Sequence, residues 1–138
     1  VEAHRQAGLD LPLVFAGTGS ARGALEAAGC RVTGWLDRDG LSGWYRSAAA
    51  LVLPSRWQEP FGIVGLEALS MGTPVAAWDS GGIAEWHPGA PDLVPWGDVG
   101  GLAGALSVAV GASASPHLEF RRESLMARLE ALYGRVAG

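Results

Sequence analysis

Residues 11–34 read LPLVFAGTGSARGALEAAGCRVTG, and this stretch decides the fold. The apolar run from Leu11 to Gly17 is typical of a buried strand, and the segment ARGALEAAG that follows the glycine turn has helical character. A second short run, from Cys30 to Gly34, predicts another strand. Strand, helix and strand in succession form the unit from which parallel sheets are built.

The same alternation continues to the end of the chain. Further strands are predicted at Ala50–Pro54, Thr73–Trp78 and Asp92–Trp96, and helices at 37–48, 62–72 and 98 to about 110. The strands are apolar on both faces, so we expect an α/β fold, a Rossmann-like parallel sheet with helices on both faces. We expect one domain over residues 1–138, in which 111–116 is a linker and 116–138 is a closing helix.

Composition excludes several classes of function. The 138 residues carry a net charge of -4, all 10 basic residues are arginine, and no basic run occurs, which argues against nucleic acid or anionic membranes as partners. A single cysteine, Cys30, forms no intrachain disulfide and reads as a small core residue. We see no signal peptide and no transmembrane segment, so a cytoplasmic protein is expected. The opening VEAHRQAGLD lacks an initiator Met and reads as the end of a helix, which suggests a fragment.

The loops after Gly17, Gly34, Pro54 and Trp78 are expected to share one rim of the sheet, where ligands bind in such folds. On that rim, the segment EPFGIVGLE places Glu59 before a helix start at Gly62 and Glu67 within the helix. The first helical turn offers backbone N–H groups to a phosphate. Because the helix is apolar nearly all round, Glu67 is expected to be buried. It would then accept bonds from a diol such as a ribose, or else pair with an arginine or reach solvent.

The glycine turns leave alternatives open. Gly17-Thr18-Gly19 follows a strand, but Arg22 stands where a dinucleotide fingerprint has its third glycine, so an anion site and a plain turn both remain possible. Gly81-Gly82 is either a close approach to a ligand or simply a loop. Glu85 either serves the site or caps a short helix, and we favour the structural role. The three histidines have no metal-ligand spacing, and no metal site is expected.

Five linked motifs resemble the nucleotide-binding signature of the retaining GT-B glycosyltransferases of family 4, also called group 1. The residues that carry the resemblance are Pro54-Ser55, Glu59-Pro60-Phe61-Gly62, Leu66-Glu67-Ala68, Gly72-Thr73-Pro74-Val75 and Gly81-Gly82-Ile83-Ala84-Glu85. Upstream, LVFAGTGS and the stretch from Val32 to Ser55 are similar to the family's turn and strand ends, and WGDVGGLAGAL is similar to a later helix start.

The resemblance implies a role for each matching residue. Glu59 would contact donor-sugar hydroxyls and act in catalysis, and Glu67 would accept the ribose hydroxyls. Amides around Phe61, Gly62 and Ile63 would face the diphosphate, Gly17 and Gly19 would border it, and the backbone from Val32 to Gly34 would hold the base. The substrate would be a nucleotide diphosphate sugar, with no cofactor and no metal.

Departures from the family pattern concern the start of the domain. The family's Arg- and Lys-bearing phosphate segment, its first strand and its N-terminal acceptor domain do not occur in this chain, so we expect the C-terminal half of a GT-B fold that is inactive alone. The alternatives are a non-catalytic nucleotide-sugar-binding module, a GT-B epimerase, a glycoside hydrolase with Glu59 and Glu67 as paired acids, and a receiver-type signalling domain.

Overall fold

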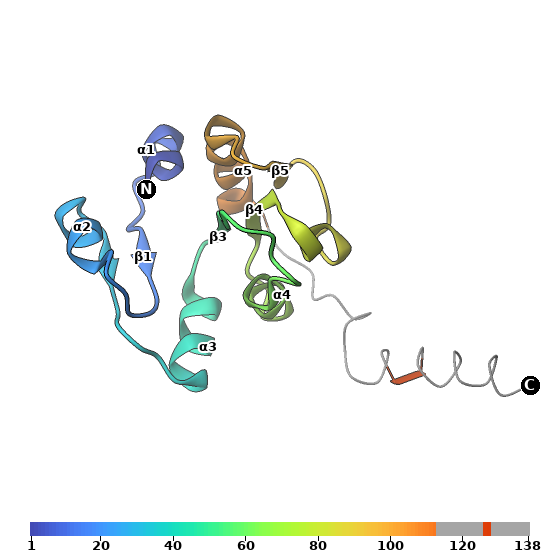
Figure 1. Ribbon diagram of the computed structural model, residues 1–138, viewed down its shortest axis with the longest axis horizontal. Coiled ribbons are helices and arrows are strands. Elements are labelled where there is room, and N and C mark those ends of the chain that lie inside the picture. The colour runs from blue at the N-terminus through green and yellow to red at the C-terminus, as the bar shows by residue number, and fades with distance from the viewer. Residues whose placement is uncertain (113–125, 128–138) are drawn as a thin grey trace, which may run out of the picture.

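A computed structural model describes residues 1–112 and 126–127. The elements in chain order are α1 (Glu2–Ala7), β1 (Val14–Phe15), α2 (Arg22–Ala27), β2 (Arg31–Val32), α3 (Arg38–Ser47), β3 (Leu51–Leu53), α4 (Ile63–Ser70), β4 (Val75–Asp79), the 3₁₀ helix η1 (Gly81–Glu85), β5 (Leu93–Pro95) and α5 (Val99–Gly111). This order confirms the alternation read from the sequence (Figure 1). The predicted closing helix lies outside the described residues, apart from the helical pair 126–127. The predicted linker at 111–116 is described only at 111–112, where Gly111 ends α5.

The strands are parallel, as predicted, but they form two sheets instead of one. β3, β4 and β5 pair in that order, with Leu51 opposite Val75 and Ala77 opposite Leu93. β1 pairs with β2 alone, with Val14 opposite Arg31. In the described chain, no hydrogen-bonded ladder joins β1 to β3. Each of these two strands is paired along one edge only, β1 with β2 and β3 with β4.

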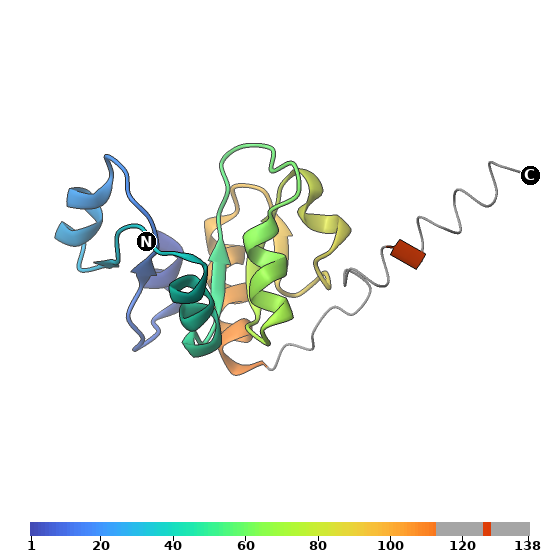
Figure 2. The ribbon, with the colours of Figure 1, turned by 90° about the horizontal axis from the view of Figure 1, so that it is seen from below.

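The carboxyl ends of the strands lie at one rim, as expected for a parallel arrangement. Figure 2 shows β1 and β3 running in the same direction, with the loops that follow them, and η1 after β4, at the top of the view. The bridge between Gly17 and Gly34 brings the end of β2 to the same rim.

Helices cover both faces of the three-stranded sheet. Alternate residues of β4 point to opposite sides: Ala76 and Trp78 pack with α1 and α5, while Val75 and Ala77 pack with α3, α4 and η1. This period of two is that of a strand buried on both faces. On the first side α5 contributes mostly alanine and leucine, namely Leu102, Ala103, Ala105, Leu106 and Ala109.

Two aspartates begin helices through side-chain caps. Asp37 accepts from the backbone N–H of Gly40 at 2.8 Å, and Asp98 accepts from that of Gly101 at 2.8 Å. The sequence predicts Asp37 or Asp39 as the cap of this helix; in the structure Asp37 caps α3, and Asp39 lies in its first turn. The sequence also predicts Asp98 as the cap of the helix that follows it, and this is confirmed for α5. Within the described ranges, no helix is long and apolar enough to cross a membrane.

Candidate functional site

The loop between β3 and α4 holds Glu59 in a defined position. The buried hydroxyl of Ser55 donates to Oε1 of Glu59 at 2.5 Å. Ser55 is itself fixed, because its carbonyl accepts from the indole N–H of Trp96 at 3.0 Å. The carbonyl of Glu59 accepts from the backbone N–H of Gly82 at 2.8 Å. The half-buried Glu59 is thus held through both its side chain and its backbone.

Gly81 and Gly82 make this arrangement possible. A Cβ on Gly81 would lie 2.1 Å from the carbonyl oxygen of Glu59, and a Cβ on Gly82 would lie 2.5 Å from that of Pro60. The close approach is therefore to the protein's own loop. These glycines also begin the helix η1, so the alternative that they form simply a loop is wrong. Ser80, just before them, donates to the carbonyl of Trp57 at 2.5 Å.

We therefore expect Gly82→Ala to destabilise the domain by about 1–3 kcal/mol, the usual cost of overpacking. The new methyl group would push Pro60 and the Glu59 loop outward, because the atom it meets is backbone. Urea unfolding would measure the change. Gly104→Ala on α5 is the matched control, since nothing lies within 4 Å of its Cβ. That control should be neutral or slightly stabilising. Equal effects of the two substitutions would contradict the role assigned to Gly82.

Helix α4 begins next to Glu59. Gly62 precedes it in a left-handed conformation with φ 73°, and no side chain caps the helix. Ile63 is 61% exposed and Val64 38% exposed, so the helix is not buried all round. This corrects the expectation drawn from its apolar composition: α4 buries one face against the sheet and η1, and its first turn opens to the rim. The buried indole of Trp86 anchors the turn by donating to the carbonyl of Phe61.

Glu67 lies on α4 and contacts α3. The hydroxyl of Tyr45 donates to its Oε2 at 3.4 Å. Burial, and secondly the charge of the Glu67 carboxylate, raise the pKa of Tyr45 to about 12, so the phenol keeps its proton at neutral pH. Glu67 is half-buried, not fully buried as expected. The two ion pairs found among the described residues, Arg5–Glu2 and Arg22–Glu26, do not include it.

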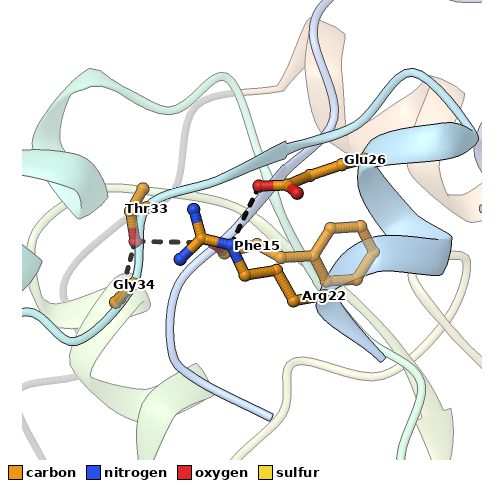
Figure 3. Close-up of polar contacts among 5 residues, drawn as sticks. All are labelled: Phe15, Arg22, Glu26, Thr33 and Gly34. Carbon is orange, nitrogen blue, oxygen red and sulfur yellow. Dashed lines mark hydrogen bonds and ion pairs between the residues drawn. The ribbon is translucent and has the colours of Figure 1, made fainter. Parts of the chain in front are cut away.

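The ends of β1 and β2 meet at the rim. The backbone N–H of Gly17 donates to the carbonyl of Gly34 at 2.8 Å, and both have positive φ, 128° and 78°. Thr33 donates to the carbonyl of Gly34 at 2.9 Å, and Arg22 pairs with Glu26 at 2.9 Å (Figure 3). The structure thus brings together two of the predicted site residues, Gly17 and Gly34. Val32 ends β2 and is half-buried, and Gly19 lies exposed in the turn before α2.

Sequence reasoning missed the hydroxyl groups that hold the two glutamates. Ser55 was read as a strand end and Tyr45 as part of a helix, although both lie in the motifs quoted above. Their pairing with Glu59 and Glu67 depends on contacts that spacing does not reveal. Glu85 is exposed at the end of η1, and the described structure gives it no capping bond.

Comparison with known proteins identifies the family. Residues 1–110 match the family model described as glycosyl transferases group 1. The chain belongs to this family. An uncharacterised glycosyltransferase of Methanocaldococcus jannaschii is 40% identical over 103 residues, which cover 62% of this chain and 26% of that protein. A D-inositol 3-phosphate glycosyltransferase of Jonesia denitrificans is 44% identical over 77 residues, 54% of this chain and 18% of that protein.

Solved structures agree on the GT-B architecture of this group 1 glycosyltransferase domain. A sucrose-phosphate synthase of Thermosynechococcus elongatus superposes with a TM-score of 0.68 at 25% identity, over 98% of this chain and 41% of that one. The HepE protein of Anabaena, solved in complex with UDP and glucose, gives a TM-score of 0.72 at 15% identity, over 99% of this chain and 44% of that one. This chain therefore spans less than half the length of each protein compared with it here.

Proposed function

We propose that this chain is the donor-binding domain of a retaining glycosyltransferase that moves a hexosyl group from a nucleotide diphosphate sugar to an acceptor hydroxyl. The observation that carries the proposal is the arrangement around the start of α4. An uncapped helix N-terminus opens at the rim, with Glu59 just before it and Glu67 within it. The helix end favours a diphosphate, and the two carboxylates favour hydroxyl groups on either side of it.

Each part of the donor then has a partner in the chain. The amides of Phe61, Gly62 and Ile63 receive the diphosphate. Glu67 accepts the ribose hydroxyls, and Glu59 accepts sugar hydroxyls. The turn at Gly17 and Gly19 borders the phosphates, and the backbone from Val32 to Gly34 holds the base. The HepE protein of Anabaena was solved in complex with UDP and glucose, which supports a nucleotide diphosphate sugar as the substrate class.

Catalysis in this proposal rests on positioning and on charge stabilisation. The bond between the anomeric carbon and the phosphate oxygen breaks, and the acceptor oxygen bonds to the same face of that carbon. The acceptor proton passes to the departing phosphate. No metal and no cofactor takes part. The N-terminal domain of the same enzyme would bind the acceptor, so the 138-residue chain alone would be inactive.

A binding screen of UDP-, GDP- and ADP-sugars against the full-length protein tests the proposal. One donor should bind and be turned over, and the anomeric configuration of the product should equal that of the donor. Binding without transfer to any acceptor would favour a nucleotide-sugar-binding module. Interconversion of sugar nucleotides would favour an epimerase.

Glu67→Ala should weaken nucleoside diphosphate affinity by about 1.5–3 kcal/mol, the range for hydrogen bonds to a charged group. Titration calorimetry with UDP, GDP and ADP would measure it, using the nucleotide that binds most tightly. Glu2→Ala is the matched control, because Glu2 is an exposed glutamate on α1, outside the motifs of the rim. Unchanged affinity in Glu67→Ala would refute the ribose assignment.

A further inference from the structure

Tyr45 and Glu67 lie 22 positions apart in the chain, and they meet between α3 and α4. The phenol oxygen of Tyr45 lies 3.4 Å from Oε2 of Glu67. Tyr45 is 6% exposed, whereas Glu67 is half-buried and reaches the surface. The tyrosine therefore approaches the carboxylate from the protein interior and leaves its outer side open.

The tyrosine is well suited to hold a carboxylate in one orientation. Its ring packs in the core cluster that includes Leu69, and its own carbonyl accepts from the hydroxyl of Thr73. A tyrosine side chain has only two rotatable bonds, so a ring fixed at this site presents its hydroxyl in one direction. The donor is thus anchored before any ligand arrives.

A neutral donor leaves the carboxylate available. A carboxylate has two oxygens with about four acceptor sites, and one phenol occupies one of these, on Oε2. An arginine would instead occupy both oxygens and balance the charge. The two ion pairs found within the described part of the chain, Arg5–Glu2 and Arg22–Glu26, do not include Glu67. Oε1 of Glu67 can therefore accept further hydrogen bonds, and neither of these ion pairs neutralises the carboxylate.

We propose that Tyr45 is a positioning residue that orients Glu67 toward the two ribose hydroxyls of the donor nucleotide. The inference rests on the proposed function of Glu67. The inference adds to that function, because it assigns the orientation of the Glu67 carboxylate to a buried hydroxyl on another helix. Tyr45 itself does not contact the nucleotide.

The test is Tyr45→Phe in the full-length protein, with affinity for UDP, GDP or ADP, whichever binds most tightly, measured by calorimetry. We expect affinity about 3- to 10-fold weaker, as for the loss of one hydrogen bond. The 2′,3′-dideoxy form of the same nucleotide is the second ligand. Because it lacks the ribose hydroxyls, Tyr45→Phe and the unmodified protein should bind it equally. For each protein, the affinities for the ribonucleotide and for the dideoxynucleotide are measured on one preparation. Their ratio therefore does not depend on the folded fraction.

Ser70→Ala is the control. Its hydroxyl donates to the backbone carbonyl of Glu67 at 2.7 Å, and it lies exposed on the same helix. This variant removes a hydroxyl next to Glu67 without touching the carboxylate, and both affinities should stay unchanged. In a double-mutant cycle, adding Tyr45→Phe to Glu67→Ala should have no further effect on affinity.

The outcomes separate the two proposals. If Tyr45→Phe weakens the ribo and dideoxy nucleotides equally, its role is structural and the inference is wrong. If Glu67→Ala weakens ribonucleotide binding but Tyr45→Phe does not, the inference fails and the ribose role of Glu67 stands. If Glu67→Ala itself changes nothing, the ribose role fails, and the inference about Tyr45 fails with it.

Discussion

Glu59→Gln in the full-length protein is expected to lower kcat about 10- to 150-fold, with nucleoside diphosphate affinity unchanged. The factor corresponds to about 1.5–3 kcal/mol for a charge-assisted hydrogen bond. Glutamine preserves the size of the side chain, and its amide oxygen can still accept from Ser55. What it loses is the negative charge toward the sugar hydroxyls. Steady-state kinetics with the best donor, together with calorimetry on the matching nucleoside diphosphate, would measure both quantities.

Glu2→Gln provides the matched control for this prediction. It removes the charge of an exposed glutamate on α1, outside the motifs of the rim, and should leave kcat unchanged. An unaltered kcat in Glu59→Gln would show that Glu59 has no role in catalysis. A fall in nucleotide affinity as large as the fall in kcat would mean that Glu59 holds the nucleotide and not the sugar.

Trp86→Ala is expected to destabilise the domain by about 3–5 kcal/mol, the range for truncating a large aromatic in a core. Trp86 is 1% exposed, and its ring packs so closely against Gly65 that a Cβ there would lie 2.2 Å from the ring. Its indole N–H also donates to the carbonyl of Phe61, at the start of α4. The substitution would thus remove apolar contacts and take the indole N–H donor away from the carbonyl of Phe61.

The control is a tryptophan at the surface. Trp35 is 81% exposed, so Trp35→Ala should change the free energy of unfolding by no more than about 0.5 kcal/mol. Urea unfolding of both variants would give the midpoints and slopes needed for the comparison. Similar losses in the two variants would show that Trp86 does not have the packing role described here.

The pattern of apolar runs was sufficient for the strands and α-helices between β1 and α5, but it did not predict the 3₁₀ helix η1. Strands near Val14 and Leu51 and the helix cap at Asp98 were predicted, and the cap of α3 was narrowed to two aspartates, because local periodicity and capping chemistry depend on neighbouring residues. The apolar composition of α4 led to a wrong prediction of its burial. Its apolar residues predicted burial on all sides, but Ile63 and Val64 are exposed, since a helix beside a sheet buries one face and its first turn here lies at the rim.

The sequence alone was enough to predict the α/β class and the family, and to place the candidate site residues at one rim of the sheet. These follow from short-range patterns and from motifs that occur in a fixed order. Only the tertiary structure decided what Gly81 and Gly82 are for, and which groups hold the glutamates. Gly82 meets Pro60 and Tyr45 meets Glu67 across 22 positions in each pair. Such contacts depend on how loops and helices pack across the sheet, and spacing along the chain carries no record of that packing.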